Sequence, residues 1–183
     1  MWRCLREAVD DADVDVNAYV FMSNHIHLLV TPRQPLAIAK LMHAATRRYS
    51  GYFNIRYRRT GTLWEGRYRA STTLTQAHFL NCHRYIDLNP VRAAMTKRAE
   101  DYAWSSHRFY ALGESNELIH PHEAITSLGG DPASRRVGYR ELFFTGLTAD
   151  ELDEIRTCTD SNRDMGDRPK VGRPPKLILA PFY

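Results

Sequence analysis

Two short apolar runs, separated by two residues, place the tightest constraint on the fold. Residues 14–22 (VDVNAYVFM) and residues 25–31 (HIHLLVT) are rich in β-branched and aromatic side chains. Ser23 and Asn24 between them have the composition of a turn. Together they predict an antiparallel β-hairpin in a chain of 183 residues, a length that suits one domain and a small appendage.

Apolar residues at helical spacing predict that helices flank this hairpin. The expected helices cover residues 2–11, 35–50, 75–88, 121–128, 132–145 and 149–158, and an irregular strand or strand pair covers residues 62–73. Gly51 should end the second helix, Thr75 should cap the third, and Asn89 with Pro90 should end it.

Composition excludes several classes of protein. No apolar run approaches the roughly 18 residues of a membrane span, and the N-terminus lacks the apolar stretch of a signal peptide. Three widely spaced cysteines fit neither a disulfide framework nor a zinc pair. We expect a cytoplasmic protein with a main domain over residues 1–110, a helical extension over 111–160 and a basic, flexible tail over 161–183.

Arginines and aromatic residues alternate between residues 47 and 69. Seven arginines stand against one glutamate in this segment, and six aromatic residues lie between them. Arginine binds phosphates and aromatic rings stack on unpaired bases, so the mixture favours single-stranded nucleic acid over a solvated face with core tyrosines behind it. The candidate DNA-binding residues are Arg47, Arg48, Arg56, Arg58, Arg59, Trp64, Arg67 and Arg69.

Two histidines one residue apart are candidates for metal ligands. In a strand, His25 and His27 point to the same face, and two neutral imidazoles at this spacing can bind one divalent cation if a third ligand is supplied. The pattern is also common on exposed strands without any metal. Further candidates are Tyr85 and Asn89, which are neighbours on one helix face and offer a phenol and an amide oxygen. A core tyrosine and a simple helix end explain that pair equally well.

Four runs along the chain resemble the single-tyrosine HUH transposases, and within them the REP-associated branch that carries an IS200-like transposase domain. They are AYVFMSNHIHLLV (18–30), GTLWEGRYR (61–69), RYIDLNPVRAA (84–94) and DYAWSSHRFY (101–110), and the resemblance spans roughly residues 1–160. It implies an α+β fold with a ferredoxin-like antiparallel sheet and helices on one side.

The same resemblance implies a metal-dependent nuclease and strand transferase that acts on single-stranded hairpin repeat DNA and associates with the nucleoid when bound to it. His25, His27 and Asn89 would then bind Mg²⁺ or Mn²⁺. Tyr85 would be the nucleophile that forms a 5′-phosphotyrosine intermediate and frees a 3′-hydroxyl. A monomer and a homodimer both fit.

The chain departs from the family at its start, because nothing before Trp2 supplies the family's first strand. That strand is central in a ferredoxin-like sheet, so its absence predicts an unpaired edge beside the histidines. A late start at Met1, an inactive remnant and a strand from another chain would each account for this. The alternatives to the enzyme are therefore a catalytically decayed DNA-binding remnant and a metal-binding regulatory protein.

Overall fold

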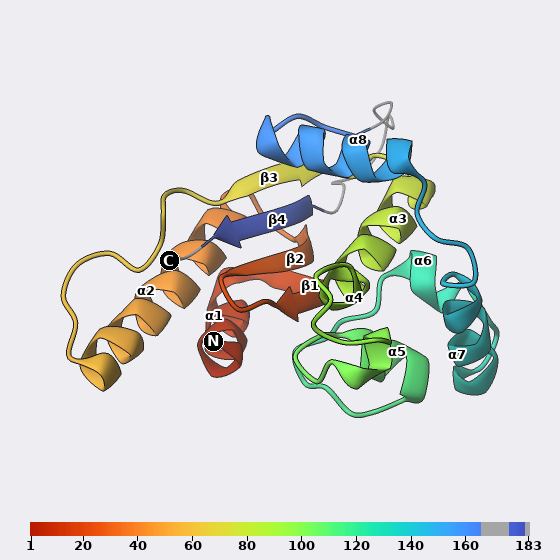
Figure 1. Ribbon diagram of the computed structural model, residues 1–183, viewed down its shortest axis with the longest axis horizontal. Coiled ribbons are helices and arrows are strands. Elements are labelled where there is room, and N and C mark those ends of the chain that lie inside the picture. Colours follow the sequence, from red (N-terminus) through yellow and green to blue (C-terminus); the bar gives the residue numbers. More distant parts are fainter. Residues whose placement is uncertain (166–175, 182–183) are drawn as a thin grey trace.

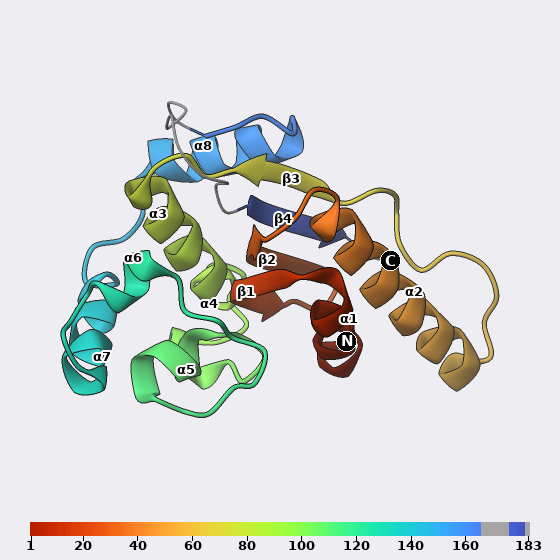
Figure 2. The ribbon, with the colours of Figure 1, turned by 180° about the vertical axis from the view of Figure 1, so that it is seen from behind.

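A computed structural model describes residues 1–165 and 176–181 of the chain, and the side chains of residues 1–165. Figures 1 and 2 show the elements from two opposite sides. In chain order they are α1 (Trp2–Ala12), β1 (Val14–Phe21), β2 (His25–Pro32), α2 (Ala37–Tyr57), β3 (Arg69–Thr72), α3 (Gln76–Asp87), α4 (Asn89–Arg92), the 3₁₀ turn η1 (Ala99–Asp101), α5 (His107–Leu112), α6 (Glu123–Thr126), α7 (Pro132–Glu141), α8 (Ala149–Asp160) and β4 (Lys176–Pro181).

The described strands form one antiparallel sheet in the order β1-β2-β4-β3. The hairpin predicted from the two apolar runs is present as β1 and β2, with Val20 opposite His27 and Tyr19 opposite Leu28. An irregularity in β1 between Val16 and Ala18 shifts the register by one residue. The α+β class is confirmed.

The sheet carries helices on both faces, not on one side as expected. Alternation puts His27 on the face covered by α3, where its ring lies beside Tyr85. Leu28, the next residue, points to the opposite face. Leu28 and Ala70 pair with the same residue of β4 from its two sides, so Ala70 shares this opposite face. Ala70 and Ile38 of α2 line one pocket, which places α2 on that face. Figures 1 and 2 show α1 and α2 on one side of the sheet and α3 on the other.

The second helix is longer than the sequence suggested. Gly51 was expected to end it, but α2 continues to Tyr57, and a Cβ at Gly51 would meet no atom within 4 Å. A glycine inside a helix costs only about 1 kcal/mol relative to alanine, so one such residue need not interrupt it. The strand expected over residues 62–73 is shorter, since only Arg69–Thr72 forms β3.

The position of β4 is the largest difference from the sequence-based picture. Residues 161–183 were expected to be flexible, yet Lys176–Pro181 forms a strand in the interior of the sheet, antiparallel to both β2 and β3. This is the place that the first strand takes in a ferredoxin-like sheet. The predicted unpaired edge beside the histidines is therefore wrong, because β4 pairs with β2 along its length, from His25 to Val30.

The rest of the described tail also packs against the domain. Met165 is buried, and its backbone N–H donates to the carbonyl of Thr72 at 2.8 Å. Among the helices of residues 1–165, none has the length and apolar character needed to cross a bilayer.

Candidate functional site

Strand β2 presents the two predicted histidines side by side. The ring centroids of His25 and His27 are 4.6 Å apart with the planes nearly perpendicular. His25 lies at the start of the strand, where its Nδ1 is 2.7 Å from the side-chain oxygen of Asn24. That hydrogen bond fixes the ring and leaves Nε2 as the nitrogen that can bind a ligand.

His27 fits the role of a metal ligand because its polar atoms are buried without partners. The side chain is 3% exposed, and neither ring nitrogen has a hydrogen bond to any residue in the described part of the chain. An unpartnered imidazole nitrogen in the interior is costly, and a cation between the two rings would satisfy it. Burial lowers the pKa of His27 well below its ordinary value, and the charges of His25 and Arg92 lower it further. The ring is therefore neutral at pH 7, as metal binding requires.

Tyr85 lies directly against this pair. Thr75 caps α3 by accepting a hydrogen bond from the N–H of His78 at 3.2 Å, as its sequence position predicts, and this sets the helix that carries Tyr85. The Tyr85 ring centroid is 5.5 Å from that of His27, and the side chain is 6% exposed. The Tyr85 side chain interacts with Arg92, through charge and a side-chain hydrogen bond that both raise the pKa of Arg92. The phenol is placed beside the histidines and is free to react.

Asn89 occupies the next turn on the same side of the helix. Its side-chain nitrogen donates to the carbonyl of Tyr85 at 3.0 Å, which leaves its amide oxygen available as a ligand. Residues 1–165 contain no cluster of three or more His, Cys, Asp or Glu side chains that could hold a metal. Two histidines and one amide oxygen are thus the donor set that the structure offers here.

Arg92 is a residue of this site that the sequence reasoning did not select. Its guanidinium carbon lies 4.3 Å from the Tyr85 ring centroid, and Nη2 donates to the Tyr85 carbonyl at 2.6 Å. Pro90 was expected to end the helix at Leu88, but α4 adds one more turn, since proline lacks only an N–H that a first turn does not use. The spacing Tyr85, Asn89, Arg92 follows the i, i+4, i+7 stripe of one helix face, and that spacing could have revealed Arg92.

A buried polar network holds the opposite side of α3. Asp87 is fully buried and accepts hydrogen bonds from Ser106 at 3.1 Å and from Tyr139, and its second oxygen is 2.8 Å from Nδ1 of His107. Burial would raise the pKa of Asp87, but the hydrogen bond and charge of His107 outweigh it and the pKa is lowered. His83 completes the network at 3.0 Å from the Tyr139 hydroxyl. The network fixes α3, and with it Tyr85, against α5 and α7.

We expect the neutral His83 to make stability depend on pH. The pKa of His83 is lowered to about 4, mainly because the side chain is buried. The charge of Asp87 opposes this shift, and His107 and His122 add to it. At pH values between about 6.5 and about 4, His83 is protonated in the unfolded chain but neutral in the folded chain. The free energy of unfolding therefore falls as the pH falls through this range. The loss from His83 alone should reach about 3 kcal/mol at pH 4.

Urea unfolding at pH 7 and pH 4.5 of wild type and His83→Gln measures this. Glutamine keeps a hydrogen-bonding group and does not titrate, so the variant should lose less stability over the interval. Equal losses in the two proteins would show that His83 is not the group responsible.

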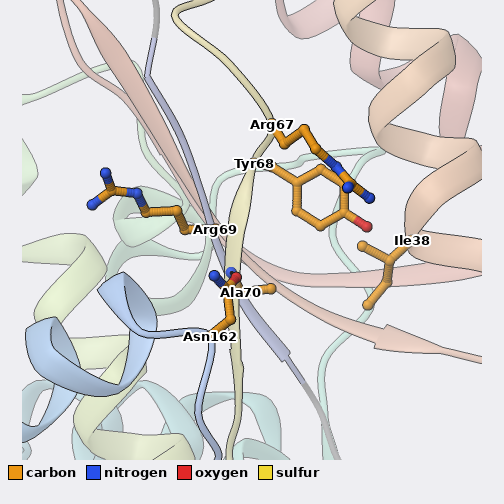
Figure 3. A pocket seen from close by; sticks show the side chains of 6 residues that line it. All are labelled: Ile38, Arg67, Tyr68, Arg69, Ala70 and Asn162. Carbon is orange, nitrogen blue, oxygen red and sulfur yellow. The ribbon is translucent and has the colours of Figure 1, made fainter.

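The predicted DNA-binding residues do not all lie on one surface. Arg69 and His27 pair with the same residue of β4 from its two sides, so Arg69 lies on the same face of the sheet as His27. The backbones of these two residues are two strand spacings apart, about 10 Å. It pairs with Asp160 of α8 at 2.6 Å. Arg67 lies next to it in a pocket of about 570 Å³ at the edge of β3 (Figure 3), lined by Ile38, Arg67, Tyr68, Arg69, Ala70 and Asn162.

The remaining predicted DNA-binding residues follow α2 and the loop after it. Arg48 forms ion pairs with Asp11 and Glu7 of α1. Trp64 is half-buried, packs near Tyr49 and donates its indole N–H to a carbonyl of α2 at 3.2 Å, so it anchors the loop to the helix. The arginines at positions 47, 56, 58 and 59 are exposed on α2 and at the start of the loop that follows it. The end of α2 and this loop extend beyond the sheet in Figure 1.

Comparison with known families identifies the domain that carries this site. The family model described as transposase, IS200-like, matches residues 1–89, which include both histidines, Tyr85 and Asn89. Residues 1–89 belong to the IS200-like transposase family. Searches of curated proteins and of solved structures found no match. The IS200-like transposase domain thus covers α1 to α3, while Arg92 lies just beyond the matched range.

The match over residues 1–89 supports a DNA-binding, DNA-processing role of the transposase type, and the family is generally metal-dependent.

Proposed function

We propose that the chain is a metal-dependent endonuclease and strand transferase for single-stranded DNA, with Tyr85 as its nucleophile. The observation that supports this best is the placement of the Tyr85 phenol beside two histidines, one of which is buried with both ring nitrogens unpartnered. A purely structural tyrosine would not need such a neighbour. The REP-associated resemblance of the sequence adds hairpin repeat DNA as the proposed substrate.

The proposed reaction is a transesterification. The Tyr85 oxygen forms a bond to the phosphorus of one phosphodiester, and the bond from phosphorus to the 3′-oxygen breaks. The phenol releases its proton to solvent, and the departing 3′-oxygen takes one up. The product is a 5′-phosphotyrosine and a free 3′-hydroxyl, and attack by another 3′-hydroxyl reverses the step and joins new DNA.

His25, His27 and Asn89 would hold Mg²⁺ or Mn²⁺, which neutralises charge on the scissile phosphate when bound. The protein contributes the fixed positions of these donors. Strand β2 presents both imidazoles in their neutral form, and the hydrogen bond from Asn89 to the Tyr85 carbonyl ties the amide to the helix that carries the nucleophile.

Arg69 and the pocket at the edge of β3 give a path for the DNA strand away from the site. Arg69 stands on the catalytic face, whereas Tyr68 and Arg67 lie on the other side of the strand, toward Ile38, where they offer an aromatic ring and a cation (Figure 3). Such a combination binds phosphates and stacks on unpaired bases, as a single strand requires. The exposed arginines on α2 would bind the duplex part of a hairpin through its phosphates.

The test is incubation of the protein with fluorescent single-stranded hairpin DNA and Mn²⁺ or EDTA, followed by a denaturing protein gel. We expect a covalent protein–DNA band with Mn²⁺ and none with EDTA. His27→Ala should lose the band while still shifting DNA on a native gel. DNA binding without any covalent band in wild type would instead support the decayed DNA-binding remnant.

A further inference from the structure

We propose that Arg92 is a catalytic residue, which stabilises the charge that develops on the Tyr85 phenol and contacts the scissile phosphate. This inference rests on the proposed function of Tyr85 as a nucleophile. It assigns to the site a cation contributed by the protein itself, in addition to the metal.

The geometry of Arg92 ties it to the nucleophile. One nitrogen donates to the Tyr85 carbonyl at 2.6 Å, and the guanidinium carbon lies 4.3 Å from the centroid of the Tyr85 ring. Within residues 1–165 it forms no ion pair with a carboxylate, and a side-chain hydrogen bond with Tyr85 adds to the contact with the backbone carbonyl. Arg33 and Arg69, in contrast, are bound to carboxylates. Arg92 therefore carries a positive charge that no acidic side chain neutralises.

The surroundings of Arg92 make this charge effective. Burial and the nearby Arg156 lower the pKa of Arg92, while Tyr85 raises it. The residue is nevertheless exposed to solvent, so a phosphate can reach it. Arg156 of α8 is thus near enough for its charge to act on Arg92, and two neighbouring cations suit an anionic ligand.

The chemistry of the proposed step explains why a cation belongs there. A neutral phenol attracts a guanidinium over its face only weakly, through the ring quadrupole. As the proton leaves and the oxygen attacks phosphorus, negative charge spreads over the phenol and the phosphate oxygens, and the same guanidinium attracts both far more strongly. An interaction that strengthens in the transition state raises the rate of the chemical step.

The experiment measures covalent adduct formation at saturating hairpin DNA with Mn²⁺, for wild type, Arg92→Ala, Arg92→Lys and Arg98→Ala. We expect Arg92→Ala to slow the adduct about 100-fold and Arg92→Lys about 10-fold, because lysine keeps the charge without the planar fork. Arg98→Ala is the matched control: it removes an exposed arginine that pairs only with Glu100 and should leave the rate unchanged.

Affinity for the same DNA, measured by fluorescence anisotropy in EDTA, separates catalysis from binding. We expect Arg92→Ala to weaken binding less than about 3-fold, and added guanidinium ion to restore part of its lost rate. Thermal unfolding of each variant checks that the fold is intact. An unchanged rate in Arg92→Ala, or a loss of rate no larger than the loss of affinity, would overturn the inference while the proposed function stands. Absence of any adduct in wild type would overturn both.

Discussion

Replacing Ile178 with proline in β4 is expected to abolish the folded state. Strand β4 forms six register pairs with β2 and four with β3, so it holds the two halves of the sheet together. At about 1 kcal/mol for each net hydrogen bond, loss of these pairs removes roughly 10 kcal/mol, comparable with the whole stability of a typical domain. A proline in a strand paired on both sides cannot be accommodated without opening the ladder.

Circular dichroism during heating measures this effect. Ile178→Pro and a chain lacking residues 176–183 should both show no cooperative transition. Ile178→Val, which keeps a branched apolar side chain, should melt within a few degrees of wild type. A cooperative transition in the shortened chain at the wild-type temperature would show that β4 is dispensable. It would contradict our account of how β2 is held.

The second large effect is expected from Tyr85→Phe, which should abolish the covalent adduct and leave stability unchanged. The ring of Tyr85 is packed beside His27, and its side chain interacts with the solvent-exposed Arg92, whose guanidinium water can satisfy once the hydroxyl is gone. Removing only the oxygen should therefore change the free energy of unfolding by less than about 0.5 kcal/mol. Loss of the nucleophile should reduce the adduct by at least roughly 1,000-fold.

A matched control for this variant is Tyr102→Phe. Tyr102 donates its hydroxyl to the carbonyl of Phe21 at 2.6 Å, so its removal costs a hydrogen bond and about 1 kcal/mol of stability but should leave the chemistry intact. The opposite pattern, with the adduct lost in Tyr102→Phe and kept in Tyr85→Phe, would refute the assignment.

The sequence predicted those elements of the fold whose deciding residues lie close together in the chain. The hairpin of β1 and β2 follows from two apolar runs around a turn, and α3 follows from Thr75 and its apolar spacing, since in each case the deciding residues lie within one element. His27 and Tyr85 could be selected for the same reason. Their proximity came only from the resemblance, because the contact joins a strand and a helix that are 58 positions apart.

The parts that could not be predicted depend on contacts between distant segments. Lys176–Pro181 is a short run after a segment rich in proline and glycine, and nothing within it indicates that it pairs with β2 and β3, which lie more than 100 residues earlier. The buried Asp87 network likewise joins α3 to α5 and α7, and no local pattern around His83 or His107 indicates that these histidines take part in it. Arg92 lies beyond the helix end that Asn89 and Pro90 predict, whereas in the structure α4 continues through it.

The most direct measurement of the central claim is to identify the residue that carries DNA after reaction. The adduct formed with Mn²⁺ is digested with protease and nuclease, and the modified peptide is sequenced by mass spectrometry. We predict a single phosphonucleotide on the oxygen of Tyr85, joined through the 5′-phosphate, with a free 3′-hydroxyl on the released strand. A nucleotide on any other residue, or a 3′-phosphate link, would contradict the account.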